Sequence, residues 1–194
     1  MKVLNKDEFM NSENLMVRRL RDSIFIYPTD TIYGIGCDAT NEELVNTIRI
    51  AKNRFDMPFS VIAPSKEWIE KNCAIDETAK SWIEKLPGPY TLILRLKNKD
   101  AVAENVNFGS DSLGVRIPNN WFSEVVTKMD VPIITTSANV AGHDFMTSLD
   151  DLDPVFREYV DYVIEQGELK GRPSTLIFLN KSKVEVKMMM NSTS

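Results

Sequence analysis

Histidine and cysteine are scarce in this sequence. Its 194 residues include one histidine, His143, and two cysteines, Cys37 and Cys73. A Ser-His-Asp triad or a histidine-rich metal site would have to be built on that single histidine, so the sequence disfavours both. The cysteines lack the spacing of metal ligands, and we expect free thiols in a reducing cytosol. No metal site is predicted.

Long apolar runs and two familiar phosphate-binding motifs are also missing. No stretch approaches the ~20 apolar residues that span a bilayer. The opening MKVLNKDEFMNSENL is polar and mixed in charge, unlike a signal peptide. We therefore expect a cytoplasmic protein with no membrane partner. No GxxxxGK[ST] loop is present, and no GxGxxG follows a strand, so any ATP is held differently from ATP in P-loop enzymes.

The composition is that of a globular protein with a core. Hydrophobic residues make up 43% and charged residues 26% of the chain, and the length suggests one domain over residues 1–194. The net charge is −5. Domains that coat nucleic acid through bulk charge are usually basic, so the balance argues against that class while leaving room for a small basic site.

Apolar strand patterns alternate with helical patterns along the chain. This order predicts an α/β fold with a mixed or parallel sheet and helices packed on it, in which ligands sit beyond strand ends. Residues 98–112 are expected to form a loop. The expected strands are 23–27, 58–63, 91–97, 114–118, 131–136, 161–167 (ending in a turn), 174–179 and 183–189. The expected helices are 41–53, 65–72, 76–86, 119–128 and 148–160.

The helix expected over residues 41–53 ends in two cations. Asn41 can cap its N-terminus. At about 100° per residue, Lys52 projects between Val45 and Ile48 on the apolar stripe, so the last turn directs a lysine towards the buried side. Lys52 and Arg54 suit an anionic ligand, although cations at a helix end also answer the helix dipole.

Several strands end in polar segments. The stretch YPTDTIYGIG at residues 27–36 follows an apolar run and fits a binding loop better than an ordinary turn. Residues 137–139 (SAN) and 173–175 (PST) are similar, and Arg116 lies within the apolar run GVRIP. Hydroxyls, amides and arginine together describe a site for a small anionic ligand.

Each of these segments also has a purely structural explanation. Thr29-Asp30-Thr31 can form an Asx or Ser/Thr turn. Arg116 can pair with an acidic neighbour across strands, and residues 137–139 can cap a helix. Spacing alone leaves these alternatives open.

The order of motifs resembles the YrdC-like family of threonylcarbamoyl-AMP synthases in its short form. The resemblance covers residues 23–180 and rests on the combination of YPTDTIYGIG, KNR, PGPYT, LGVRIP, TTSANVAG and PST. It implies a large twisted mixed sheet flanked by helices, with a deep positive cavity. It also implies a reaction in which L-threonine, bicarbonate or CO2, and ATP give threonylcarbamoyl-AMP and pyrophosphate. Partner transferase components then pass the threonylcarbamoyl group to tRNA.

The resemblance also assigns roles to individual residues. The catalytic cations on the ATP phosphates would be Lys52 and Arg54. The ATP site would be completed by Ser112, Thr135, Ser137 and Asn139. The threonine site would contain Thr31, Tyr33, Arg116 and Ser174, with Arg116 on the carboxylate. Mg2+ on the phosphates is compatible with this chemistry, but no carboxylate cluster is evident for it.

The sequence departs from the family pattern in three places. Phe55 stands where many relatives have proline, and Ala141 replaces the usual serine of the SANxSG stretch. The final KVEVKMMM lacks the family's arginine-glycine ending, for which Lys183 or Lys187 are the available substitutes.

Two other functions remain to be weighed. One is an RNA-binding or ribosome-maturation module with the same fold, which the net charge and the lack of an aromatic-basic surface pattern disfavour. The other is a carbamoyl-adenylate-forming relative, like the homologous domain of hydrogenase-maturation carbamoyltransferases, whose further catalytic domains have no counterpart here.

Overall fold

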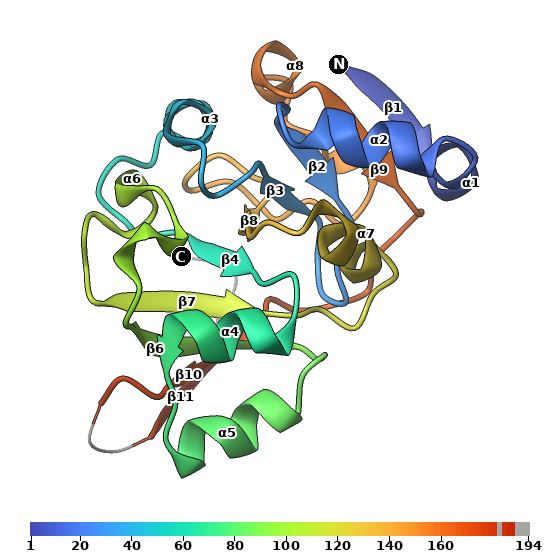
Figure 1. Cartoon of the computed structure of the whole chain (residues 1–194). Helices are drawn as coiled ribbons and strands as arrows, with labels where there is room; N and C mark the ends of the chain where they lie inside the picture. Colours follow the sequence, from blue (N-terminus) through green and yellow to red (C-terminus); the bar gives the residue numbers. More distant parts are fainter. Residues whose placement is uncertain (182–183, 189–194) are drawn as a thin grey trace.

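The computed structural model describes residues 1–181 and 184–188. Within these residues, eleven strands form one sheet in the order β1-β9-β2-β3-β8-β4-β7-β6-β10-β11, with β5 paired to β6 outside this path (Figure 1). The strands are β1 (Lys2–Asn5), β2 (Phe25–Tyr27), β3 (Gly34–Gly36), β4 (Ser60–Ile62), β5 (Cys73–Ala74), β6 (Tyr90–Leu96), β7 (Ser112–Arg116), β8 (Ile133–Ser137), β9 (Tyr162–Glu165), β10 (Thr175–Phe178) and β11 (Glu185–Met188).

Short helices and turns connect and flank the strands. They are α1 (Lys6–Met10), α2 (Glu13–Leu20), α3 (Glu42–Lys52), α4 (Lys66–Asn72), α5 (Glu77–Glu84), α6 (Glu104–Asn107), α7 (Phe122–Met129) and α8 (Phe156–Tyr159), with 3-10 turns η1 (Lys99–Ala101) and η2 (Leu149–Asp151). None of the helices in the described residues is long and apolar enough to cross a membrane.

The sheet is mixed, as the sequence predicts. Neighbours β4 and β7, and β6 and β10, run parallel, whereas β3 and β8, and β6 and β7, run antiparallel. Strand residues alternate between two cores. Ile26, for example, belongs to a cluster with α3 and α5, while Phe25 and Tyr27 belong to a second cluster with α1, α2 and α7. Figure 1 shows α2 and α7 lying together on the side away from α3. The expected fold class, a mixed sheet flanked by helices, is confirmed.

The two glycines of YPTDTIYGIG lie in a strand, which corrects the interpretation of the whole stretch as a loop. Gly34 and Gly36 begin and end β3, which pairs with β2 and β8. A Cβ on Gly36 would lie 2.1 Å from the backbone oxygen of Ile134 on β8, far inside van der Waals contact. The second glycine therefore permits close strand packing, and the loop itself is confined to the residues before β3.

Two other regions differ from expectation, and a third, before β2, forms elements where none were expected. Residues 98–112 contain η1 and α6, and the helix expected over 148–160 is two short pieces, η2 and α8. Pro154 lies between these pieces and has no N–H to continue a helix. Before β2 the chain already forms β1 at the sheet edge, followed by α1 and α2. Of the expected last strand, 184–188 is described, and Lys183 and Met189 lie outside the described residues.

Candidate active site

The loops after several central strands enclose a cavity of about 110 Å3. This is smaller than the ~300–1,000 Å3 of a typical small-molecule site, so the enclosed space would hold only part of a nucleotide or amino acid. Two arginines, Arg54 and Arg116, and no acidic residue line it within the part of the chain that the structure describes. The lining residues are Thr29, Thr31, Ile32, Tyr33, Gly34, Arg54, Pro58, Phe59, Ser60, Thr91, Arg116, Thr135, Thr136, Ser137, Phe145, Pro173, Ser174 and Leu176.

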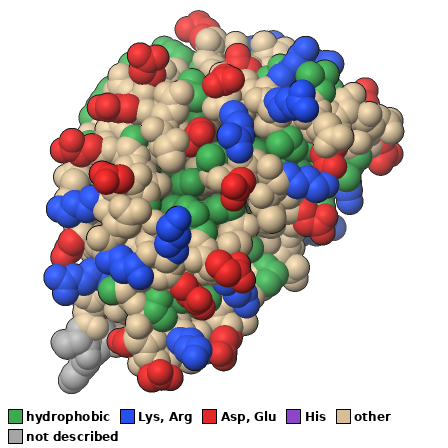
Figure 2. Space-filling model, in the orientation of Figure 1, with side chains coloured by type: hydrophobic (Ala, Val, Ile, Leu, Met, Phe, Trp, Pro, Cys, Tyr) green, Lys and Arg blue, Asp and Glu red, His purple; other side chains and the backbone are tan. Residues whose placement is uncertain are grey.

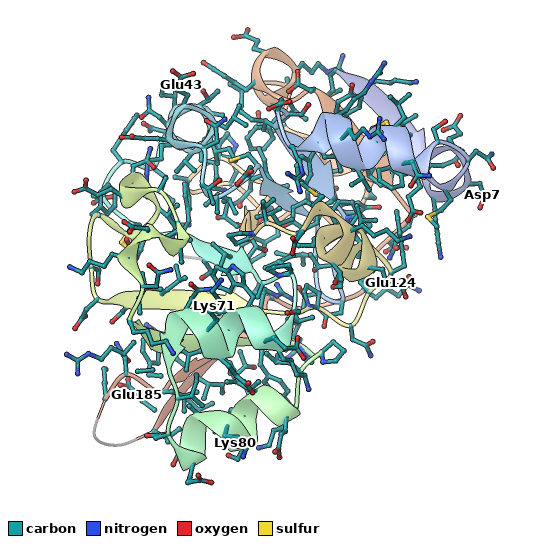
Figure 3. All side chains as sticks on the ribbon, in the orientation of Figure 1. Asp7, Glu43, Lys71, Lys80, Glu124 and Glu185 are labelled. Carbon is teal, nitrogen blue, oxygen red and sulfur yellow. The ribbon has the colours of Figure 1, made fainter. Side chains whose placement is uncertain are left out.

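The charges on the visible surface differ from those of the cavity. Figure 2 shows acidic and basic side chains scattered together over one face, and Figure 3 shows the labelled Glu43 and Glu124 pointing outward from α3 and α7. Arg116 is buried and Arg54 half-buried. The net charge of −5 therefore does not describe the cavity, because both charged residues that line it are positive.

The loop between β2 and β3 is a Ser/Thr turn that also lines the cavity. The Thr29 hydroxyl accepts a hydrogen bond from the Thr31 amide at 3.1 Å and donates to the Ile32 carbonyl at 2.7 Å. The Tyr33 hydroxyl donates to the Gly167 carbonyl at 2.8 Å and accepts from the Gln166 amide at 3.0 Å. The structural interpretation as a Ser/Thr turn is therefore confirmed, and residues of this turn also line the cavity. Tyr33 borders the cavity while its hydroxyl is engaged elsewhere.

Arg116, at the end of β7, pairs with Asp30 from this loop. Its Nη2 lies 2.6 Å from the Asp30 carboxylate and 3.5 Å from the Thr31 hydroxyl. Burial lowers the pKa of Arg116, and the Asp30 charge opposes that shift. Its buried Nε finds no hydrogen-bond partner among the described residues. An acidic neighbour is therefore present, but it comes from the loop between β2 and β3 and not from an adjacent strand.

Arg54 approaches the cavity from the turn after α3. Its Nη1 donates to the Thr136 hydroxyl at 3.3 Å, and its Nη2 donates to the Pro58 carbonyl at 3.1 Å. Its buried Nε, like that of Arg116, has no partner within the described residues. Since buried donors are normally paired, each of these two cavity-lining arginines carries an unusual unsatisfied donor.

Lys52 is buried, as its projection on α3 predicts, but it does not line the cavity. Its Nζ lies 2.5 Å from the carbonyl oxygens of both Ser137 and Asn139, and 3.5 Å from the Asn139 Oδ1. Burial, followed by repulsion from Arg54, lowers the pKa of Lys52 to about 7. Lys52 thus anchors the segment that starts at Ser137, the last residue of β8, without lining the cavity itself. Its predicted phosphate contact stays a prediction.

The predicted nucleotide residues of β8 divide between the cavity and its support. Thr135 and Ser137 line the cavity, whereas Asn139 does not. The Ser137 hydroxyl bonds to the Asn139 Oδ1, and the Asn139 Nδ2 donates to the His143 carbonyl at 2.7 Å. In the structure Asn139 therefore orders the loop that starts at Ser137.

Ser174 lies at the cavity and Ser112 does not. The Ser174 hydroxyl is 2.7 Å from the Thr91 hydroxyl of β6, and both residues line the cavity. Ser112 begins β7, at the opposite end of that strand from Arg116, and bonds to Asn180. A contact between Ser112 and ATP would require a ligand that extends beyond the enclosed space, and it stays a prediction.

Several cavity residues were not among those predicted. Thr91 belongs to the PGPYT motif and Thr136 to TTSAN, so the motifs themselves pointed to them. Ser60 and Phe145 carried no comparable signal, because only the pairing of β4 with β8 and the path of the loop after Asn139 bring them there. Within the described residues, no group of three or more His, Cys, Asp or Glu side chains could hold a metal ion.

Comparison with known proteins identifies the family of this chain. The family model for Sua5, YciO and YrdC proteins, described as telomere recombination, matches residues 19–187. The chain belongs to this family.

Two curated relatives are named as threonylcarbamoyl-AMP synthases, one of them as putative. A putative threonylcarbamoyl-AMP synthase of Methanocaldococcus jannaschii is 37% identical over 169 residues, which is 85% of this chain and 78% of the relative. The threonylcarbamoyl-AMP synthase of Pseudoalteromonas atlantica is 29% identical over 162 residues, covering 80% of this chain and 84% of the relative.

A solved structure shows the same fold with an amino acid bound. The crystal structure of P. abyssi Sua5 complexed with L-threonine superposes with a TM-score of 0.86 at 27% identity and covers 96% of this chain. This chain spans 56% of the length of that protein.

Proposed function

We propose that this protein is a nucleotidyltransferase that forms threonylcarbamoyl-AMP and pyrophosphate from L-threonine, bicarbonate or CO2, and ATP. The observation that carries the proposal is the meeting of Arg54 and Arg116 at one cavity, each with a buried and unpartnered Nε. The reaction brings together an amino-acid carboxylate and a triphosphate, and each arginine suits one of these anions.

Arg116 would bind the threonine carboxylate. Asp30 occupies Nη2 of its guanidinium, which fixes the orientation of the planar group and leaves Nε for the ligand. Hydroxyls of Thr31, Thr91 and Ser174 lie at the same cavity and can orient the polar groups of the amino acid. Threonine would thereby present its amino nitrogen, carrying the carboxyl group, to the nucleotide.

Arg54 would stabilise the negative charge at the α-phosphate. N-carboxythreonine attacks this phosphorus through a carboxylate oxygen, and pyrophosphate leaves. Fixed cations and backbone N–H groups can stabilise the developing charge without a protein nucleophile. Lys52, which contacts the carbonyls of Ser137 and Asn139, would add its positive charge to this stabilisation. Much of the rate enhancement would come from positioning three reactants in one orientation.

The remaining participants follow from this chemistry. Mg2+ would enter bound to the ATP phosphates as part of that substrate. Transferase components would take the adenylate and modify tRNA, and tRNA itself would bind this acidic protein weakly. The proposal implies a cytoplasmic location, where these reactants are found. We also propose that residues 1–194 work as one domain, since the described strands share a single sheet.

The test is pyrophosphate release from ATP by the purified protein, with threonine and bicarbonate omitted in turn. Release that requires both establishes the reaction. Release with bicarbonate but no threonine would replace threonine by a carbamoyl-type substrate. If ATP binds by calorimetry but no pyrophosphate forms, even with transferase components and tRNA present, the proposal fails. Salt-dependent tRNA binding would then favour an RNA-binding module.

A further inference from the structure

Arg49, on α3, is a buried arginine with no acidic side chain among its hydrogen-bond partners in the described residues. Its exposed fraction is 3%. The guanidinium carbon lies 4.3 Å from the ring centroid of Phe59 and 4.2 Å from that of Phe108. The group is thus held between two aromatic rings, an arrangement that stabilises a desolvated cation.

Five hydrogen bonds join this guanidinium to the main chain of two other segments. Towards α6, Nε and Nη2 donate to the Asn105 carbonyl at 2.9 and 2.6 Å, and Nη2 also donates to Val106 at 3.1 Å. Towards the turn after α3, Nη1 donates to the carbonyls of Arg54 and Met57 at 3.1 and 2.9 Å. A guanidinium has five N–H donors, so its donor capacity is fully used.

The same residue holds the Arg54 backbone at both its amide and its carbonyl group. The Arg54 amide donates to the Arg49 carbonyl at 2.9 Å, while the Arg54 carbonyl accepts from the Arg49 side chain. Between Arg49 and Arg54 the chain reverses at Asn53, which adopts a left-handed conformation with φ 50°. The direction in which Arg54 leaves the helix is therefore determined by Arg49.

The anchored turn forms one wall of the cavity. Arg54, Pro58, Phe59 and Ser60 line it, and Arg54 also bonds to the Pro58 carbonyl of the same turn. Arg49 itself does not line the cavity. A loss of the Arg49 contacts would thus reach the cavity through the position of this turn and of the adjoining Phe59, whose ring Arg49 contacts.

We propose that Arg49 is a positioning residue that fixes the 54–58 turn so that Arg54 meets the phosphates of ATP. This inference rests on the proposed function. Lysine cannot replace Arg49, because one ammonium nitrogen cannot reach the carbonyls of two separate segments. The adjacent charges also oppose one another. After burial, the Arg54 charge is the next cause that lowers the pKa of Arg49. The turn is thus held in place despite the repulsion between Arg49 and Arg54, and an anionic ligand beside Arg54 would relieve that repulsion.

Arg49→Lys tests the proposal, with Val45→Ala as the matched control. Val45 is buried on the same helix, and its truncation weakens packing without touching the turn. We expect Arg49→Lys to lower kcat/KM for ATP by about 10- to 100-fold, the effect of a small misplacement of a reacting group. The threonine KM should stay within about twofold. Val45→Ala should lower Tm and leave both KM values unchanged. If Arg49→Lys lowers Tm only, with wild-type kinetic constants, Arg49 is purely structural.

Two further measurements keep the outcome independent of folding and of the reaction assignment. If Arg49→Lys does not fold, Phe108→Leu removes one face of the aromatic pair and should produce a weaker effect of the same kind. Amide hydrogen exchange of residues 54–57, the part of the turn that carries backbone N–H groups, is followed with and without an ATP analogue. Faster exchange of the turn in Arg49→Lys than in the wild type, with no such change in Val45→Ala, supports Arg49 as the residue that fixes the turn, even if no pyrophosphate is ever released. Exchange in Arg49→Lys at the wild-type rate overturns that role. Failure of the proposed function alone would leave the exchange difference intact.

Discussion

Asp30 and Arg116 form a buried ion pair at the edge of the cavity, with 2.6 Å between the carboxylate and Nη2. Their side chains are 10% and 7% exposed. The second oxygen of Asp30 accepts from the Asn119 amide at 2.8 Å. Asp30 is thus fixed from both sides, and it holds the guanidinium in one orientation instead of merely neutralising it.

Removing this guanidinium should impair threonine binding. We expect Arg116→Ala to raise the threonine KM by about 10- to 100-fold, because a hydrogen bond to a charged group contributes about 1.5–3 kcal/mol. The ATP KM should change much less. Initial rates of pyrophosphate release, measured against threonine concentration, check this.

The folding control for Arg116→Ala is essential, because the substitution strands the Asp30 charge. Breaking a buried pair in this way costs about 3–5 kcal/mol. Asp30→Asn with Arg116→Ala removes both charges and should recover part of the stability without restoring threonine binding. An unchanged threonine KM in a folded Arg116→Ala protein would remove Arg116 from the threonine site.

Arg54 should matter on the nucleotide side. We expect Arg54→Ala to abolish measurable turnover while the protein stays folded, since removing one donor at a developing charge typically costs about 10²–10³ in rate. Arg95→Ala is the matched control. This arginine lies on β6 with its side chain 70% exposed and forms only a 3.7 Å contact with Asp111. Near wild-type rates in Arg54→Ala would show that the phosphates bind elsewhere.

The sequence predicted the cavity residues better than it predicted their partners. Periodicity placed Lys52 towards the interior, and the polar strand ends predicted Thr31, Ser137 and Ser174 beside one another. For Arg116 the sequence predicted only that an acidic residue could pair with it, and did not identify that residue as Asp30. Nothing local reveals that Lys52 would face the carbonyls of Ser137 and Asn139, because that contact spans 85 and 87 residues of chain. Long-range geometry of this kind depends on strand order.

The same limit explains which features of the fold the sequence analysis missed or misinterpreted. The N-terminal β1 pairs with β9, about 160 residues later, so its pairing partner lies far outside any local window. Gly34 and Gly36 were interpreted as part of a binding loop, yet both serve close packing inside β3. Local propensity favours a turn at such glycines, and tertiary contacts decided otherwise.

Lys52 should make stability depend on pH in a definite direction. Its pKa is about 7 in the folded protein and 10.5 ordinarily. Between these values the unfolded chain binds the proton and the folded protein does not, so the free energy of unfolding rises with pH, by at most about 1.4 kcal/mol per unit. That contribution is fully present above the unfolded pKa and is lost as the pH falls towards 7.

Lys52→Met isolates this contribution. We expect the stability difference between wild type and Lys52→Met to grow in favour of the wild type from pH 7 to 9.5, as measured by urea unfolding. The comparison cancels the other groups that titrate in this range. A flat difference would mean that Lys52 keeps its charge, stabilised by its three oxygen neighbours. Lys52→Ala should also abolish turnover at pH 7, where a pKa of about 7 leaves Lys52 partly charged, since both that charge and the support of the Ser137 segment are lost.

Gly171 should be essential to the threonine side of the cavity. A Cβ at this position would lie 1.9 Å from the Thr31 carbonyl oxygen and 2.5 Å from the Thr31 Cα, and the backbone of a Ser/Thr turn cannot easily retreat. Gly171→Ala must therefore displace the chain that carries Pro173 and Ser174 into the cavity. We expect the threonine KM to rise by about tenfold or more, with a smaller change for ATP. Lys170→Ala, an exposed neighbour on the same segment, should behave as wild type. If Gly171→Ala retains the wild-type threonine KM, then Thr31 and Ser174 do not act on the same ligand, and the amino acid binds outside the space between them.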